Sequence, residues 1–403
     1  MTLLSRRATF SGLAAVACTR PVSAQSIGPD ATLYGAPDYP LPPRELARRE
    51  GNPWSPKYRV GAFTHLDEIY ETRKVARAAE PWPFKHAAAS QPVSFVTEYL
   101  ARNPVMGLLV AKDDRILIEQ YQYGRTDRDR FVSQSMVKSI TSLLVGLAIA
   151  DGAIRSVDDT PDMYVPGFKG SEYGRTPLRA LLHMSSGVDF GEERDGGADL
   201  NRLWRGLVGG MPRKDTIGSI VQFDRRIAPP GRRYHYASIE PDVLGVVVRQ
   251  TTGRSMAGYL QEKIWQPIGA ESDATWLLDA EGGELAHFGF SAVLRDYARL
   301  GRLLAHDGAW NGKQLISAQW LHDATTVERP EDAYLAPGSA TKDAGYGYLF
   351  WLLPGTRRQF AMFGAFGQRI IVDPPSKLVM VQTALDDKGQ WPALWRTLVT
   401  QFG

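Results

Sequence analysis

The sequence predicts an α+β fold, in which an antiparallel sheet is flanked by helices and a mostly helical lobe is inserted into it. Three observations predict this fold: an apolar hairpin early in the chain, an almost wholly apolar helix after it, and short alternating segments near the C-terminus. A mature chain of about 380 residues exceeds one ordinary hydrophobic core. We therefore assign residues 61–150 and 290–403 to a sheet lobe and residues 151–289 to a helical lobe.

Residues 1–24 have the features of an export signal, with a basic start, a short apolar run and small residues before Gln25. The pair Arg6-Arg7 favours the twin-arginine route, and the apolar run is too short to span a bilayer as a helix. Cys18 is the single cysteine, so its removal would leave no disulfide and no thiolate nucleophile. We expect a periplasmic or secreted protein; the alternative is a chain anchored to lipid through Cys18.

The mature chain is predicted to carry no net charge. The full sequence has 47 Lys and Arg against 44 Asp and Glu, a net charge of +3. Cleavage after Ala24 removes Arg6, Arg7 and Arg20 and no acidic residue, so these charges balance. Because there is no basic patch we expect no nucleic-acid partner, and we expect no transmembrane segment in the mature chain.

The first part of the mature chain predicts an arm, a hairpin and a helix. Residues 25–60 are rich in proline and are typical of an extended arm. Residues 105–111 and 116–123 alternate around a turn and predict a hairpin. Residues 176–187 predict a helix that ends at a glycine, and the pattern remains mostly helical, with long loops, to about residue 290.

The last part of the chain predicts one amphipathic helix and a meander. Residues 291–304 place Val293, Tyr297, Leu300 and Leu304 on one stripe, which is typical of a helix that faces the core. Later segments alternate with turn residues and predict antiparallel strands at residues 346–353, 359–364, 368–373 and 378–383. The early hairpin and the late meander together predict one sheet built from both ends of the chain.

The most apolar helix of the chain begins at a candidate nucleophile. Residues 140–149 leave almost no polar face, so we expect this helix to be buried on all sides and to end before Gly152. At its start, Ser135-Met-Val-Lys138 is an S-x-x-K pattern, whose spacing puts both side chains on one face of the first turn. The helix amides and dipole favour negative charge there. The alternative interpretation of Ser135 is a helix N-cap.

The S-x-x-K pattern occurs a second time, at Ser339-Ala-Thr-Lys342. That match lies in a turn-rich loop with no rigid element to hold a nucleophile in place. The context therefore favours Ser135.

A serine nucleophile needs a base, and the spacing ties no histidine to Ser135. Because burial disfavours a charged ammonium, Lys138 at the start of a buried helix is the candidate base. Tyr236 is the candidate phenol that shares the proton. The histidines are scattered, and we interpret each as a structural or surface residue: His65, His86, His183, His235, His287, His306 and His322.

Three ordered motifs resemble those of a known superfamily. They are Ser135-x-x-Lys138, then Tyr236-Ala-Ser238 leading into Asp242-Val-Leu-Gly245, then Gly364-Ala-Phe-Gly-Gln368 on a late strand. The set resembles the serine β-lactamase and penicillin-binding protein superfamily, within it the class C-like esterase branch that includes 6-aminohexanoate-dimer hydrolase. The likeness runs from about residue 60 to the C-terminus and implies a β-lactamase/transpeptidase-like fold.

The resemblance also implies a role for each matching residue. Ser135 would attack a carbonyl, Lys138 would help to take its proton, and Tyr236 would exchange a proton with the serine and the leaving group. The backbone N–H groups of Ser135 and Ala365 would form the oxyanion hole. A small-molecule substrate is expected, with no metal and no organic cofactor. The residues expected to bind that substrate are Ser238, Gly364, Phe366, Gly367, Gln368 and Arg194.

The chain departs from the superfamily's pattern at three positions. Met362 stands where most β-lactamases and D-Ala-D-Ala peptidases carry a lysine that helps to bind a substrate carboxylate. Ser238 stands where those enzymes usually have asparagine, a change that the esterase branch tolerates. Arg194 stands where that branch is expected to have tyrosine; it either binds a substrate carboxylate or is an exposed loop arginine.

The leading hypothesis is a serine hydrolase that cleaves a small amide or ester through an acyl-serine intermediate. The alternatives are a β-lactamase or D-Ala-D-Ala carboxypeptidase, and a non-catalytic scaffold with the same fold. Loops around residues 190–215 and 325–345 are expected to shape the pocket. Trp204, Trp276 and Trp351 either line it or belong to the core, which is the default for each.

Overall fold

The computed structural model describes residues 27–44, 54–86, 93–192, 197–209, 215–326 and 345–403. Several sequence predictions lie outside these residues: the export signal at residues 1–24, the substrate contact at Arg194, the second S-x-x-K pattern at residues 339–342, and much of the predicted pocket loops around residues 190–215 and 325–345. The described part of the 25–60 arm contains short helical turns: η1 (Ala31–Tyr34), η2 (Pro56–Tyr58) and the start of α2 (Arg59–Thr64).

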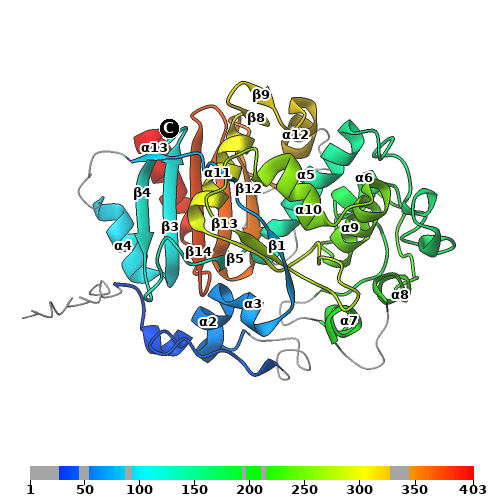
Figure 1. Ribbon diagram of the computed structural model, residues 1–403, viewed down its shortest axis with the longest axis horizontal. Coiled ribbons are helices and arrows are strands. Elements are labelled where there is room, and N and C mark those ends of the chain that lie inside the picture. The colour runs from blue at the N-terminus through cyan, green and yellow to red at the C-terminus, as the bar shows by residue number, and fades with distance from the viewer. Residues whose placement is uncertain (1–26, 45–53, 87–92, 193–196, 210–214, 327–344) are drawn as a thin grey trace, which may run out of the picture.

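An eight-stranded sheet is built from both ends of the chain, as predicted, with the strand order β10-β11-β12-β13-β14-β3-β4-β2 (Figure 1). All neighbours pair antiparallel except β2 and β4, which are parallel. The strands are β2 (Lys85–His86), β3 (Val105–Lys112), β4 (Arg115–Tyr121), β10 (Gly345–Tyr346), β11 (Trp351–Leu352), β12 (Phe360–Gly364), β13 (Gln368–Asp373) and β14 (Leu378–Ala384).

The first segment of the predicted meander is shorter than expected. Residues 346–353 contain parts of two short strands, because Leu349 has a left-handed φ of 60° and the chain turns there. The Leu349 N–H accordingly donates to Leu182 O and Gly347 O instead of continuing a strand.

Helices cover both faces of this sheet. On one face, α11 (Leu294–Ala305) packs across β3, β13 and β14, and on the other face α4 (Ser94–Arg102) and α13 (Trp391–Phe402) bury an apolar cluster of their own. The predicted stripe of α11 is buried, although the helix starts later than expected because Phe290–Ala292 forms strand β7. Among the described residues, none of the helices has the length and hydrophobicity needed to cross a membrane.

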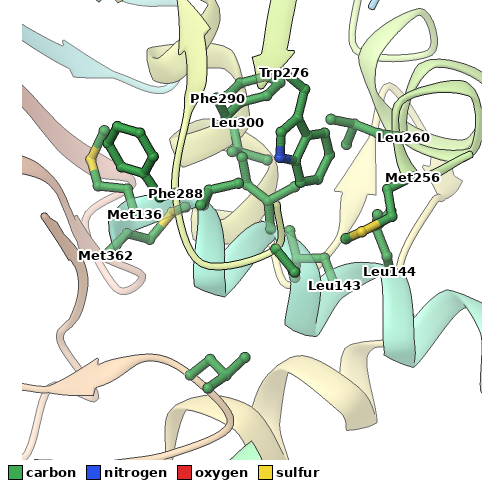
Figure 2. Close-up of a cluster of buried hydrophobic side chains, with 14 of the residues drawn as sticks. Met136, Leu143, Leu144, Met256, Leu260, Trp276, Phe288, Phe290, Leu300 and Met362 are labelled. Atoms are coloured by element: carbon green, nitrogen blue, oxygen red, sulfur yellow. The ribbon is translucent and has the colours of Figure 1, made fainter. Parts of the chain in front are cut away.

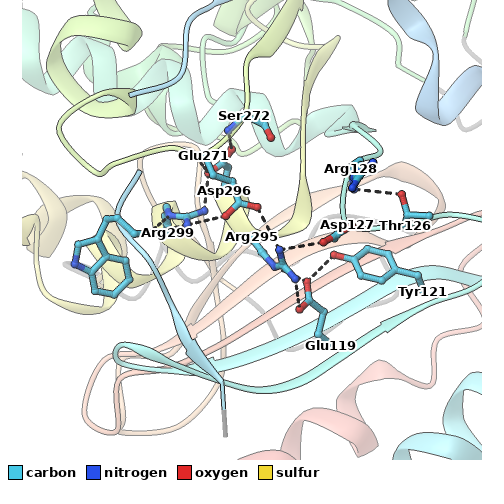
Figure 3. A network of polar contacts seen from close by, with 11 residues as sticks. Glu119, Tyr121, Thr126, Asp127, Arg128, Glu271, Ser272, Arg295, Asp296 and Arg299 are labelled. Carbon is cyan, nitrogen blue, oxygen red and sulfur yellow. Dashed lines mark hydrogen bonds and ion pairs between the residues drawn. The ribbon is translucent and has the colours of Figure 1, made fainter. Parts of the chain in front are cut away.

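An ion-pair network joins α11 to the sheet and to the loop before β6 (Figure 3). Arg295 donates to both oxygens of Glu119 at 2.8 and 2.9 Å, and Arg299 donates to Asp296 at 2.8 Å. Burial raises the pKa of Asp296 to about 6, although the neighbouring Arg299 guanidinium acts to lower it. The network therefore fixes the orientation of α11 at its N-terminal end.

A small four-stranded sheet combines one early strand with three strands from residues 131–292, and most of the remaining helices also lie between residues 122 and 292. The sheet has the order β1-β6-β7-β5, with β1 (Thr72–Val75), β5 (Phe131–Val132), β6 (Ala274–Leu277) and β7. The helices are η4 (Pro161–Met163), η5 (Pro166–Phe168), α6 (Leu178–Leu182), α7 (Ala198–Trp204), η6 (Arg205–Gly209), α8 (Thr216–Val221), α9 (Ile239–Thr252), α10 (Met256–Leu260) and η7 (Gln261–Trp265).

Helix α6 is shorter than the helix predicted for residues 176–187. It ends at Leu182 because Met184 has a left-handed φ of 52° and the Ser185 N–H and hydroxyl both return to Ala180 O. The remaining short elements are α3 (Leu66–Ile69), β8 (Ala309–Trp310), β9 (Lys313–Gln314), α12 (Ala318–Thr325) and η9 (Ala365–Gly367).

Helix α5 (Val137–Ala150) lies between the eight-stranded sheet and helices α9 and α10 (Figure 1). Every residue from Val137 to Ala148 is buried, as the apolar sequence predicted. Gly152, with φ of 74°, follows the helix end. Figure 2 shows the surrounding core, in which Leu143 and Leu144 of α5 belong to the same buried cluster as Trp276 and Phe290.

Candidate active site

Ser135 lies in a strained turn between a strand and a helix, and these elements set its position. Strand β5 pairs with β7, and the next N–H, that of Ser133, donates to Phe290 O at 2.7 Å. Gln134 then adopts a left-handed φ of 48°, which is unfavourable for a residue with a side chain. The 3-10 turn η3 (Gln134–Met136) leads directly into α5. Ser135 is half-buried while both of its neighbours are buried, so the turn presents its side chain outward from the core.

Lys138 directs its amine at Ser135. Its Nζ lies 2.7 Å from Ser135 Oγ, which agrees with the expectation that the S-x-x-K spacing places both side chains on one face. Lys138 is only 2% exposed, and no carboxylate among the described residues forms an ion pair with it. The N-cap alternative for Ser135 is wrong, because Met136 holds the N-cap position of α5 and no side chain caps the helix.

Lys138 has a second hydrogen-bond partner, the backbone carbonyl of His287, whose position is fixed by a buried Asp–His pair. Lys138 Nζ donates to the carbonyl oxygen of His287 at 3.2 Å. The carboxylate of Asp242 accepts from His287 Nδ1 at 2.7 Å and from the Ala286 N–H at 2.9 Å. Thr141 on α5 also donates to Ala286 O at 3.0 Å. These bonds fix the 286–287 backbone against α5, and they give Asp242 and His287 a role that sequence spacing did not predict.

Tyr236 lies beside Lys138 and is packed among aromatic rings. Lys138 Nζ is 4.9 Å from the centroid of the Tyr236 ring. Trp351 of β11 stacks on the same ring at 6.1 Å and 26°, and the buried Tyr346 meets it edge-on at 6.3 Å. Burial, followed by the neighbouring Tyr236, raises the pKa of Tyr346 well above its usual range, so that ring stays neutral. The three motif residues Ser135, Lys138 and Tyr236 are thus brought together by the fold.

The end of strand β12 approaches the turn before Ser135. A Cβ atom built on Gly364 would lie 2.4 Å from Ser133 O and 2.8 Å from the Gln134 Cβ, so only glycine fits at this position. The next residue, Ala365, is exposed. The close approach places the backbones that carry the two predicted oxyanion donors, Ser135 and Ala365, next to each other.

Met362, which replaces the expected lysine, is fully buried on the same strand. It belongs to the apolar cluster that also contains Met136 (Figure 2). The third motif therefore presents no cation of its own from this position.

Two of the predicted substrate contacts in the third motif have other partners. Gln368 has no exposed surface. Its side-chain amide forms hydrogen bonds with backbone groups, and the shortest of these bonds is 2.6 Å long, to Ala384 O. Gln368 therefore braces the turn and does not suit direct substrate contact. Phe366 has a left-handed φ of 61° and packs against Phe63 at 5.4 Å and under the Arg59 guanidinium at 4.5 Å. Gly367 is buried behind it.

Ser238, the predicted substrate contact of the second motif, already has a partner. Its Oγ donates to Glu192 Oε1 at 2.7 Å, and its N–H donates to Glu192 Oε2. Ser238 is 3% exposed. Its hydroxyl is therefore committed to Glu192, an acid that the sequence did not single out. The only signal was its place in the Phe190-Gly-Glu segment, which does not distinguish it from its acidic neighbour.

A second acid lies buried under the same helix start. Glu240 accepts from the Ser186 N–H at 3.3 Å, while its other oxygen has no partner among the described residues. Burial raises the pKa of Glu240 to about 8, and the hydrogen bonds from Ser186 only partly offset that effect. Glu240 is thus mostly protonated at neutral pH.

The three candidate pocket tryptophans differ in position. Trp276 is fully buried and its Nε1 donates to Leu285 O at 2.7 Å, so it belongs to the core. Trp204 is also buried, edge-on to Phe288 at 5.7 Å. Only Trp351 is half-buried and touches a motif residue, Tyr236. Across the described residues there is no group of three or more His, Cys, Asp or Glu side chains arranged to hold a metal ion.

Known proteins are similar to this chain in sequence and in fold. The family model described as Beta-lactamase matches residues 93–393. The 6-aminohexanoate-dimer hydrolase of Paenarthrobacter ureafaciens is 27% identical over 344 residues, covering 82% of this chain and 85% of that protein.

Two solved structures share the fold. A "Putative 6-aminohexanoate-dimer hydrolase from Bacillus anthracis" superposes with a TM-score of 0.73 at 23% identity, covering 86% of this chain and 94% of the other. A class C β-lactamase has a TM-score of 0.55 at 14% identity, covering 74% and 92% respectively. The match of the family model to most of the chain, with the fold, shows that this protein belongs to the Beta-lactamase family and is a serine hydrolase.

Proposed function

We propose that this hydrolase cleaves a small amide or ester through an acyl-enzyme on Ser135, with Lys138 and Tyr236 moving the protons. One observation carries the proposal. The Lys138 amine is 2.7 Å from Ser135 Oγ, and the lysine has almost no solvent exposure. The amine also donates a hydrogen bond to His287 O at 3.2 Å. A serine paired with a buried amine at a helix start is suited to nucleophilic attack on a carbonyl.

In the acylation step, Ser135 Oγ forms a bond to the substrate carbonyl carbon while its proton passes to Lys138 Nζ. The carbonyl π electrons move onto oxygen, and the Ser135 and Ala365 amides stabilise that charge. When the tetrahedral species collapses, the bond to the leaving group breaks. Tyr236, next to Lys138, passes a proton to the departing nitrogen or oxygen.

In the deacylation step, a water molecule takes the place of the leaving group. It gives a proton to Tyr236, which lost one in acylation, as its oxygen bonds to the acyl carbon, and the bond to Ser135 Oγ then breaks as Lys138 returns the proton that it had accepted. Oγ regains a proton, so the residues return to their starting state with one water consumed.

The test compares the wild-type protein with Ser135→Ala on a nitrophenyl ester, a chromogenic cephalosporin and a linear aminohexanoate dimer. We expect turnover of the ester or the dimer that disappears in Ser135→Ala, and an acyl adduct on the peptide that contains Ser135. Ser339→Ala is the matched control, because it changes the other S-x-x-K pattern. Retained turnover in a folded Ser135→Ala protein would contradict the proposal.

The same assay separates the alternative activities. Ser135-dependent cleavage with the cephalosporin untouched supports an esterase or amidase. Rapid cephalosporin turnover supports a β-lactamase or a D-Ala-D-Ala carboxypeptidase, despite Met362 in the third motif. If none of the three substrates is turned over and Ser135 carries no adduct, the result supports the non-catalytic scaffold.

We also propose that the chain is exported. The proposal is supported by the basic, apolar and small-residue pattern of residues 1–24. Cell fractionation with mass determination of the mature N-terminus tests it, with Arg6→Lys/Arg7→Lys as the variant that should block a twin-arginine route. A mature chain that begins at a lipid-modified Cys18 would replace the secreted form by the anchored one.

A further inference from the structure

A carboxylate from another segment is hydrogen-bonded to the second motif. Both oxygens of Glu192 accept hydrogen bonds from Ser238, one from the backbone N–H and one from the hydroxyl at 2.7 Å. A carboxylate offers an acceptor on each oxygen, so it suits this pair of donors. Ser238 is also the N-cap residue of the 14-residue helix α9, where the helix dipole favours a negative charge. The fold thus places the Glu192 carboxylate against Ser238, which is two residues along the chain from Tyr236.

The backbone that carries Glu192 is held on three sides. Phe190 O lies 2.6 Å from His235 Nε2, the Gly191 N–H donates to Asp199 Oδ2 at 2.9 Å, and Glu192 itself is bound by Ser238. These bonds join the segment to helix α7, to the second motif and to the start of α9. The position of the carboxylate is therefore fixed before any substrate binds.

No described cation neutralises this charge. Glu192 is half-buried, and among the described residues it forms no ion pair. The Lys138 amine points to Ser135 and His287 O, and Met362 removes the cation of the third motif. Arg59, behind Phe366, donates to the carbonyl oxygens of Trp54 and Leu385. Counting only the described residues, the side of the site near Tyr236 and Ser238 therefore carries a carboxylate without an ion-pair partner.

We infer that Glu192 is a specificity-determining residue that selects against substrates with a carboxylate near the scissile bond and favours neutral or cationic ones. The inference rests on the proposed function, since it concerns the substrate of that same site. Two like charges brought into a partly desolvated site repel, while a cation is attracted. Glu192 and Met362 act in the same direction, one by adding a negative charge and one by lacking a positive one.

A purely structural role for Glu192 is the competing explanation, and it predicts a different result. If Glu192 only holds the 190–192 segment against α9, its loss changes the rates of all substrates by a common factor. If its charge selects substrates, its loss changes the ratio between charged and neutral substrates. The ratio of two kcat/KM values is therefore the informative quantity.

The test uses phenyl ester substrates that are matched in size and carry no charge, a carboxylate or a trimethylammonium group. One series places the charge on the acyl part and the other on the leaving group. In at least one series, Glu192→Gln should raise the carboxylate-to-neutral ratio of kcat/KM on the order of tenfold and lower the cation-to-neutral ratio. Glutamine keeps the size of the side chain and one acceptor for Ser238.

Two further variants act as controls. Ser238→Ala removes one hydrogen bond to Glu192 but keeps its charge, so the discrimination against carboxylates should persist. Glu98→Gln, on helix α4 beyond the other face of the sheet, removes an exposed charge and should leave both ratios unchanged (Figure 1). Unchanged ratios in Glu192→Gln, in both series, would overturn the inference. Ser135-dependent turnover of the neutral ester tests the proposed function separately, so the two failures are distinguishable.

Discussion

His287 Nδ1 lies 2.7 Å from Asp242 Oδ2, and the carbonyl oxygen of the same histidine accepts a hydrogen bond from Lys138 Nζ. Both side chains are buried, so this pair sets where the lysine amine can rest. The candidate base is thereby positioned by helix α9, which carries Asp242, as well as by its own helix.

We expect Asp242→Asn to weaken this arrangement. His287 Nδ1 and the Ala286 N–H bond different oxygens of Asp242, and asparagine has an NH2 donor in place of one of them, so a buried donor loses its acceptor at a cost of about 1–3 kcal/mol. The value of kcat/KM should fall on the order of tenfold as the Lys138 amine loses its fixed partner. Thr141→Val is the control, because it removes a bond to Ala286 O but not the His287 clamp. Equal loss of activity at equal loss of Tm in both variants would contradict a specific effect on Lys138.

Replacing the buried amine should stop the first chemical step. We expect Lys138→Met and Lys138→Arg both to lower the rate of acylation by about 10²–10⁴-fold, because neither side chain takes a proton from Ser135 Oγ. Rapid-mixing measurement of the nitrophenolate burst reports this step. A normal burst in folded Lys138→Arg would show that positive charge alone is required at this position.

The junction of β12 with the nucleophile turn gives a third prediction. A methyl group on Gly364 cannot fit 2.4 Å from Ser133 O, so Gly364→Ala should push the Ala365 amide away from Ser135. The loss of one oxyanion donor corresponds to about a 10²–10³-fold lower kcat. Gly258→Ala is the matched control, on an exposed turn of α10 where the methyl would meet only the Ser255 hydroxyl. Full activity in a folded Gly364→Ala protein would contradict an oxyanion hole at this strand end.

The buried Glu240 predicts a specific dependence of stability on pH. Its pKa is raised from 4.5 to about 8 in the folded state, so between these values the folded protein keeps a proton that the unfolded chain releases. This group therefore costs no stability below about pH 4.5 and costs most above about pH 8. Glu240→Gln should raise Tm by a few degrees at pH 8.5 relative to wild type, and by less at pH 5. Equal differences at both pH values would show that ionisation of Glu240 does not matter to folding.

Much of the fold follows from local pattern. The structure contains the early hairpin, the buried helix after Ser135, the amphipathic helix near residue 300 and the late meander. These elements are predictable because apolar residues that recur every two positions mark one face of a strand, and those that recur every three to four positions mark one face of a helix. The differences arise where a single backbone angle decides. The left-handed residues Met184 and Leu349 end a helix and split a strand, and neither residue type announces such an angle.

The sequence by itself determined the S-x-x-K pair, since a helical turn brings residues three apart together whatever surrounds them. The resemblance to the superfamily also pointed to the glycine of the third motif and to the missing lysine. Only the tertiary structure decided the partners that come from distant segments: His287 behind Lys138, Asp242 behind His287, and Glu192 on Ser238. Such contacts join segments 45 to 149 residues apart, and their distances depend on how α5, α9 and the intervening loops pack, which no local pattern encodes.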